Sequence, residues 1–324
     1  MHLDPRLRWD EHIRIAAQKG EKKLRVLETL ARSTWGARLE RARVLHTAII
    51  RPTLLYGSGV WGPQHIADAL ATTKTKKMLA PLTKVDKVGL IRVSGAYRAC
   101  TTETLQEETG IPPLLVEVVV ASASLMSRTT TGRMADIFKR QKKKIEAAAE
   151  ALWPRGRRSH GPRPPTPHEQ KEATHQQDER VGPALRKHLW EELHRRQAAG
   201  KHTTAKQIHL RHAGLSRGQS SLAVHLRTGK IGLDDYLYKR HVPGIATPDC
   251  TCGQARETPT HIFLFCPTHA EARRSLLARL PHTNITRLTE EPRGLALLTR
   301  WLLQIGRIAQ FRNVNAEEPP RRSN

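Results

Sequence analysis

The chain has 324 residues, and its 55 lysine and arginine residues against 30 aspartate and glutamate residues give a formal net charge of +25 at pH 7. Such a surplus repels itself and calls for a polyanionic partner, with nucleic acid the first candidate and an anionic membrane the second. No apolar run approaches the ~18–20 residues of a membrane span, and the N-terminus has no apolar signal region, so we expect neither insertion nor export.

Residues 1–138 are predicted to form a helical domain. Apolar residues recur at spacings of three, four and seven over 13–30, with basic residues between them. After a break at 33–36, a second helical pattern covers 39–52, and a third, basic stretch covers 70–93. These patterns predict a mainly α fold rather than a sheet.

The sequence predicts the start and end of one short helix near residue 100. Thr101 is a suitable N-cap with Glu103 close behind it, and Gly110 is a suitable stop. The apolar run 114–120 then predicts another helix, although its valine content also permits a strand.

A change of character follows at residue 139. Residues 139–180 are rich in basic residues and proline, and we expect a disordered linker there. Its charge is compatible with a solvated spacer or with a nucleic-acid-binding arm. The arm would use Arg155, Arg157, Arg158 and Arg163.

Residues 181–324 are predicted to form a smaller helical C-terminal domain. Its amphipathic segments are 185–193, 216–227, 233–238, 268–280 and 295–308.

A cysteine–histidine cluster is the strongest chemical signal. Cys250, Cys252, His261 and Cys266 follow the spacing C-x-C-x8-H-x4-C, and Gly253 suits the sharp turn after the close pair. Three thiolates and an imidazole, without a carboxylate or an open position, indicate a structural zinc site of the zinc-knuckle kind. The alternative is that the cysteines are small core residues and His261 is a satisfied polar side chain.

Two residues outside this cluster have related chemistry. His269 is a possible substitute ligand. Cys100 is distant in sequence and is expected to be a buried thiol.

Further nucleic-acid contacts are possible in the C-terminal domain. Arg217, Arg227 and Lys230 carry donors suited to phosphate. Helix capping and a solvated face explain the same residues nearly as well.

Four aromatic residues are spread over the N-terminal part. Trp9, Trp35, Tyr56 and Trp61 are expected to be core aromatics, with base stacking as the alternative.

Several blocks carry a resemblance when taken in chain order. They are Leu3-Asp4-Pro5-Arg6-Leu7-Arg8-Trp9 with Ser33-Thr34-Trp35-Gly36; Arg51-Pro52 with Tyr56-Gly57 and Trp61; Ile91-Arg92 with Gly95-Ala96-Tyr97-Arg98 and Thr101-Thr102; Gly214-Leu215-Ser216-Arg217; Leu226-Arg227-Thr228-Gly229-Lys230; and the cysteine–histidine cluster with Glu257-Thr258. Together they resemble the thumb region and the zinc-binding tail of reverse transcriptases from non-LTR retrotransposons, the fungal kind in particular.

The resemblance implies a chain without the family's catalytic parts. The polymerase palm and its metal-binding carboxylates would precede Met1, the N-terminal endonuclease domain is missing, and the basic linker stands where the ribonuclease H domain is expected. Asp234 and Asp235 mimic a polymerase motif, but Gly232 and Leu233 replace the aromatic-x pair that precedes it, so we expect a helix start or turn there.

These observations predict a non-catalytic remnant of a transposable element. We expect it to bind RNA or DNA through a basic surface, with a structural zinc, and possible contact with other parts of a retrotransposon particle. We expect no small-molecule substrate and no membrane partner, and an intracellular location, in the nucleus rather than the cytoplasm. The alternatives are a protein–protein assembly module and an active RNA-directed DNA polymerase or nuclease fragment.

Overall fold

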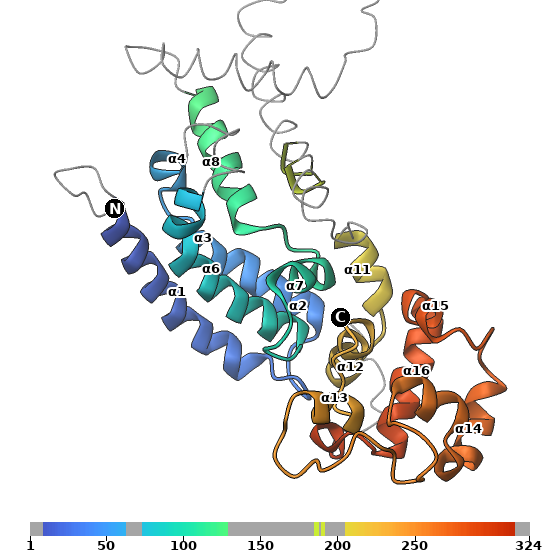
Figure 1. Ribbon diagram of the computed structural model, residues 1–324. Coiled ribbons are helices and arrows are strands. Elements are labelled where there is room, and N and C mark those ends of the chain that lie inside the picture. Colours follow the sequence, from blue (N-terminus) through green and yellow to red (C-terminus); the bar gives the residue numbers. More distant parts are fainter. Residues whose placement is uncertain (1–8, 63–72, 129–184, 188, 192–204, 315–324) are drawn as a thin grey trace, which may run out of the picture. The chain divides into compact units, whose positions relative to one another are not determined.

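The computed structural model describes residues 9–62, 73–128, 185–187, 189–191 and 205–314 (Figure 1). Within these ranges the chain is mainly α-helical, and its only strand-like pairings are the isolated bridges Ala31–Gly36 and Asp249–Arg256. The predicted mainly α class is therefore confirmed. The predicted linker 139–180 lies outside the described residues, and so do its four arginines.

Two compact units make up the fold, and each combines segments that are far apart in sequence. Unit 1 contains Met1–Gly20, Arg51–Asp86 and Pro112–His202, and unit 2 contains Glu21–Ile50, Lys87–Ile111 and Thr203–Asn324. Both units therefore draw on residues from either side of the predicted linker, unlike the predicted domains 1–138 and 181–324. Two long helices, α1 (Asp10–Leu30) and α6 (Thr73–Ser94), contribute residues to both units.

Unit 1 is built around the valine-rich run, which forms helix α8 (Leu114–Arg128) and not a strand. Val116, Val118 and Val119 are all fully buried, so the helix is covered on more than one face. Two short helices, α3 (Arg51–Leu54) and α4 (Ser58–Trp61), precede it in this unit, and α4 packs against α8. The Ser122 hydroxyl donates a hydrogen bond to the Ser58 carbonyl over 3.1 Å across this contact.

The aromatic residues of the N-terminal part are not all in the core. Trp61 is buried and donates its indole N–H to the Tyr56 carbonyl over 2.9 Å. Trp9 is half-buried. Trp35 and Tyr56 are each 58 % exposed. The prediction of core aromatics is therefore wrong for those two side chains. Their carbonyls accept hydrogen bonds, from the Arg32 N–H at Trp35 and from the Trp61 indole at Tyr56, while most of each ring faces solvent.

Unit 2 contains the cysteine–histidine cluster and most of the C-terminal helices. Its helical elements include α2 (Leu39–Leu45), the π-helical turn His46–Ile50, α7 (Thr102–Thr109), α11 (Ala205–His212), α12 (Arg217–Arg227), α13 (Asp234–Lys239), α14 (Ala270–Leu277), α15 (Ile285–Glu290) and α16 (Pro292–Ile305). The core around the cluster includes Leu222, Phe263, Leu298 and Trp301 together with the cysteines Cys250 and Cys266.

Local signals set the ends of two of these helices. The Thr101 hydroxyl accepts a hydrogen bond from the Thr104 N–H, and Gly110 ends α7 in the left-handed conformation, as the sequence predicts. At α12, Ser216 and Gln219 form a reciprocal capping box.

Candidate metal centre

The first two ligands of the centre lie on a tight hairpin-like turn. The bridge Asp249–Arg256 closes this turn, and the Cys250 N–H donates to the Ala255 carbonyl over 2.8 Å. Gly253 has a φ of +72°, a conformation that other residues rarely adopt, and its N–H donates to the Cys250 carbonyl. This geometry places the Cys250 and Cys252 side chains on the same turn although only one residue separates them.

The other two ligands lie at the two ends of a single wide helical turn. Residues His261–Phe265 form a π-helix, and the Cys266 N–H donates to the His261 carbonyl over 2.8 Å. A bond between residues five apart is the π-helical pattern, which recurs at functional sites. It brings the His261 and Cys266 side chains to one side of the chain.

The four ligand atoms form one cluster. The three sulfurs and the imidazole nitrogen all lie within 4.8 Å of one another. Cys250 Sγ is 3.7 Å from Cys266 Sγ, and Cys252 Sγ is 3.2 Å from His261 Nε2. Thiolates ~2.3 Å from a tetrahedral zinc would be about 3.8 Å apart, whereas a disulfide would need about 2.0 Å. The predicted cluster is therefore formed, its cysteines are free, and it can hold a metal ion.

The remaining sulfur and imidazole candidates lie apart from this cluster. Cys100 is a buried free thiol, as the sequence predicts. His269 is not among the clustered ligands, and its ring stands edge-on to Trp301 with 6.0 Å between the ring centroids. Among the described residues the candidate ligand set is thus Cys250, Cys252, His261 and Cys266.

The surroundings act differently on the thiols of the close pair. A backbone hydrogen bond from Gln254 lowers the pKa of the Cys252 thiol, because it favours the thiolate. Burial raises the pKa of the Cys250 thiol. A bound cation would oppose this effect of burial on the pKa, since it stabilises thiolates directly.

A buried carboxylate ties the cysteine turn to the rest of unit 2. Glu257 is fully buried and accepts a hydrogen bond from the Asp234 N–H over 2.7 Å. The Arg307 guanidinium forms a bidentate pair with Glu257 and donates to Asp234 over 2.8 Å. Burial raises the pKa of Glu257, although these donors oppose it. Sequence reasoning missed Arg307, because no local pattern connects it to a residue 50 positions earlier.

The Asp234–Asp235 pair lies in the first turn of α13, as the sequence predicts. Asp235 accepts from Lys239 over 2.7 Å and from Arg256 over 2.6 Å. Although partial burial opposes the shift, these two cations lower the pKa of Asp235. Both carboxylates therefore serve ion pairs within unit 2.

Two of the arginines that the sequence suggested for phosphate contacts have internal partners instead. Arg217 is only 4 % exposed and donates to the backbone carbonyls of Arg32, Arg92 and Val93 over 2.6–2.7 Å. Burial lowers its pKa to about 10. Three carbonyl acceptors occupy this guanidinium, so it is unavailable to a phosphate and the sequence interpretation is corrected.

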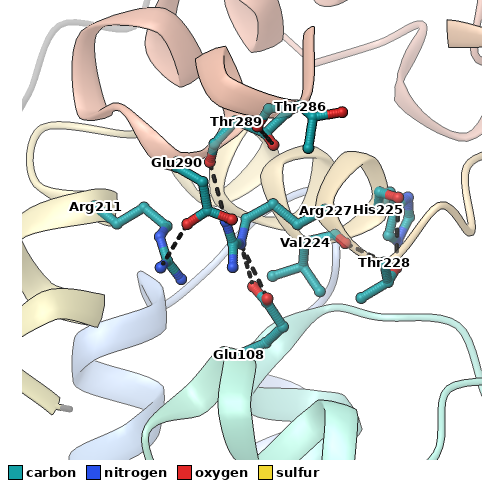
Figure 2. Close-up of polar contacts among 9 residues, drawn as sticks. All are labelled: Glu108, Arg211, Val224, His225, Arg227, Thr228, Thr286, Thr289 and Glu290. Carbon is teal, nitrogen blue, oxygen red and sulfur yellow. Dashed lines mark hydrogen bonds and ion pairs between the residues drawn. The ribbon is translucent and has the colours of Figure 1, made fainter. Parts of the chain in front are cut away.

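Arg227 lies in an ion-pair network that joins α7, α12 and α15. Figure 2 shows its guanidinium between Glu108 and Glu290, with Arg211 beside Glu290. It donates to Glu108 over 2.9 Å and to the Thr289 carbonyl over 3.1 Å. Arg227 is therefore a structural residue as well. Lys230 is half-buried in the turn after α12.

Comparisons with protein-family models, with curated proteins and with solved structures find no match to this chain. Within the described residues, no helix combines the length and the apolar character that crossing a bilayer requires.

Proposed function

We propose that this protein binds RNA or DNA through a basic surface, and that its cysteine–histidine centre holds one structural zinc. On this proposal it is a non-catalytic relative of the thumb and tail of non-LTR retrotransposon reverse transcriptases, working inside the cell and in the nucleus. The resemblance of its sequence blocks to that family supports the family assignment. The distribution of charge supports nucleic-acid binding.

The observation that carries the proposal is the pairing of buried carboxylates with arginines, which leaves the excess positive charge on other residues. Buried carboxylates are matched with arginines, as in the pairs Asp86–Arg51, Glu108–Arg227 and Glu257–Arg307. Each such pair is neutral, so the net charge of +25 must be carried by other cations. A polyanion that displaces counterions is the partner that such a surface favours.

Helix α1 presents some of those cations together. Lys19, Lys22 and Arg25 are exposed, and none of them forms an ion pair with any residue in the described part of the chain. Their spacing of three residues places them on one face of the helix. We call these three residues the α1 cationic face. They replace Arg217 and Arg227 as candidate phosphate contacts.

The donor set supports zinc as the metal. Three thiolates and one imidazole are soft or borderline ligands, which suit zinc and disfavour magnesium or calcium. The residues present therefore fit the ion that the spacing predicts. Four protein ligands leave no position for substrate or water, so the proposed role is structural.

No catalytic role is proposed for the Asp234–Asp235 pair. Polymerase and nuclease chemistry needs carboxylates gathered around metal ions, whereas these two are engaged by Arg307, Lys239 and Arg256. Purified protein should neither extend a primer nor cleave an RNA–DNA hybrid. Magnesium-dependent activity that disappears in Asp234→Asn and Asp235→Asn would contradict this part of the proposal.

The α1 cationic face provides a direct test. The triple variant Lys19→Gln/Lys22→Gln/Arg25→Gln should bind duplex DNA more weakly, and its plot of log affinity against log salt should be flatter by about 0.9 per lost phosphate contact. The measurement is a fluorescence titration at several salt concentrations. The loss should be similar for different sequences, because phosphate contacts carry no base information.

A matched control removes the same charge from cations that already have partners. Arg14, Arg274 and Arg287 are exposed but lie in ion pairs with Glu11, Glu271 and Glu291. Their triple replacement with glutamine should change the salt slope less. Equal effects in the two triple variants would mean that only net charge matters and would remove the α1 face from the proposal.

One observation favours the assembly-module alternative. Val26 and Leu30 are 57 % and 45 % exposed and lie one turn apart on α1. An exposed apolar pair of this kind suits contact with another protein. A chain that self-associates and ignores nucleic acid at low salt would favour this alternative.

A further inference from the structure

A shallow cavity of about 430 Å³, largely open to solvent, lies beside the cysteine–histidine centre. Its lining comes from the cysteine turn, the π-helical turn and the segment that joins them, all in unit 2. The lining residues are Gln254, Ala255, Arg256, Thr258, Thr260, His261 and Phe265. Cavities of roughly 300–1,000 Å³ hold small organic ligands in proteins, so this one has room for a nucleoside-sized group.

Phe265 is the unusual member of this lining. Its side chain is 66 % exposed, the largest exposed fraction of any large apolar residue in the described part of the chain. Its neighbours Phe263 and Ile262 are fully buried, so the same turn contributes two residues to the core and one to the surface. An exposed phenyl ring beside a cavity is a stacking surface for a planar partner.

Two candidate metal ligands flank Phe265 along the chain. His261 begins the π-helical turn, Phe265 ends it and Cys266 follows directly. A metal bound by both ligands would hold the backbone at Phe265 in place. A stacking residue on such a fixed backbone has less conformational entropy to lose when a ligand binds.

The rest of the lining adds polar groups suited to the edge of a base and to a phosphate. Gln254, Thr258 and Thr260 carry amide or hydroxyl groups. The Arg256 side chain is 51 % exposed and is held by its ion pair with Asp235. Lys239 pairs with the same carboxylate, so this group of three charges keeps one positive charge in excess. An aromatic surface, hydrogen-bonding groups and a surplus cation together suit an unpaired nucleotide better than an uncharged apolar ligand.

We propose that this cavity holds one unpaired base of a single-stranded nucleic acid, stacked on Phe265. The inference rests on the proposed function and narrows it, because a paired base inside a duplex cannot reach a ring at this position. Phosphate contacts elsewhere on the chain would bind any nucleic acid, and the Phe265 cavity would add a preference for single strands.

The test compares single-stranded RNA with the duplex of the same sequence. Both are fluorescein-labelled 20-mers titrated with the full chain in its metal-bound form. Phe265→Ala should weaken single-strand binding about 5- to 150-fold, the loss expected for one stacked base. The affinity of this variant for the duplex should stay within twofold of the wild-type value. Phe265→Trp should restore single-strand binding, since an indole ring stacks at least as well as a phenyl ring.

Two further variants keep the result interpretable. Tyr238→Ala removes an aromatic side chain that is 42 % exposed but does not line the cavity, so it should leave both affinities unchanged. Thr260→Leu narrows the cavity from an exposed lining position, and it should weaken single-strand binding even if Phe265→Ala disturbs the turn. Metal content is measured in each variant to show that the centre is intact.

The outcomes separate the two proposals. An unchanged single-strand affinity in Phe265→Ala and Thr260→Leu, with normal binding by the original chain, would overturn the base site alone. Equal losses on single strand and duplex would also overturn it, since stacking cannot act on a closed duplex. Failure of the original chain to bind either probe at low salt would overturn the proposed function and this inference with it.

Discussion

Replacing Cys266 with serine is expected to release the metal and to unfold the part of unit 2 around it. Cys266 is fully buried and is both a ligand and a member of the core cluster that contains Phe263 and Trp301. Structural zinc sites contribute about 10–16 kcal/mol of apparent binding energy at pH 7 in small peptides, which exceeds the stability of many domains. The loss of one ligand should therefore abolish cooperative unfolding of this region.

Metal analysis and thermal unfolding check this prediction. The original chain should contain about one zinc, and a chelator should lower its melting temperature. Cys266→Ser should contain none and should be insensitive to chelator. The control is Cys100→Ala, which removes a buried thiol outside the cluster and should keep the metal.

The metal content of the chain should also depend on pH. Metal binding requires three deprotonated thiols and a neutral imidazole, so protons compete with the ion and affinity falls as pH falls. The metal should therefore dissociate on acidification and rebind on return to neutral pH. A metal-free chain whose unfolding is unchanged by added zinc or by chelator would contradict the assignment of this site.

Replacing Asp86 with alanine is expected to lower the free energy of unfolding by about 3–5 kcal/mol, because it leaves a buried charge without its partner. Arg51 and Asp86 are 5 % and 1 % exposed and form a bidentate pair within unit 1, with bonds of 3.0 Å and 2.8 Å. Chemical denaturation measures the loss. The joint replacement Arg51→Met/Asp86→Leu should recover most of it, since no unpaired charge remains.

An exposed pair supplies the comparison. Arg14 and Glu11 lie three residues apart on α1 with side-chain exposures of 57 % and 43 %. Solvent screens such a pair, so Glu11→Ala should lower the free energy of unfolding far less than Asp86→Ala does. If Asp86→Ala proved as mild as Glu11→Ala, the burial of the Arg51–Asp86 pair would be refuted.

Local signals in the sequence predicted the helices and the metal ligands. The Thr101 cap and the Gly110 stop act over fewer than ten residues, and both lie where they were expected. The four metal ligands fall within 17 consecutive residues, so turn geometry alone can bring them together. The apolar run 114–120 fits either a buried helix or a buried strand, so its pattern alone does not decide between them. It forms helix α8 and packs within unit 1.

Local sequence patterns cannot predict hydrogen bonds and ion pairs between residues that lie far apart in the chain. The three carbonyl acceptors of Arg217 lie 124, 125 and 185 residues away in the sequence, and Glu108 lies 119 residues from Arg227. From the sequence, both arginines are expected to be free cations on an amphipathic helix. They are buried by distant segments that come together only in unit 2, and charge alone cannot predict this. The prediction that they contact phosphate is therefore wrong.

The most direct test of the central claim is a salt titration of the intact, metal-bound chain with labelled RNA and DNA. The account predicts binding at low salt, weak sequence preference, and a log affinity that falls linearly with log salt, with a slope of about −0.9 for each phosphate contacted on duplex DNA and about −0.7 on single strands. Absence of binding to both nucleic acids at low salt by folded protein would contradict it.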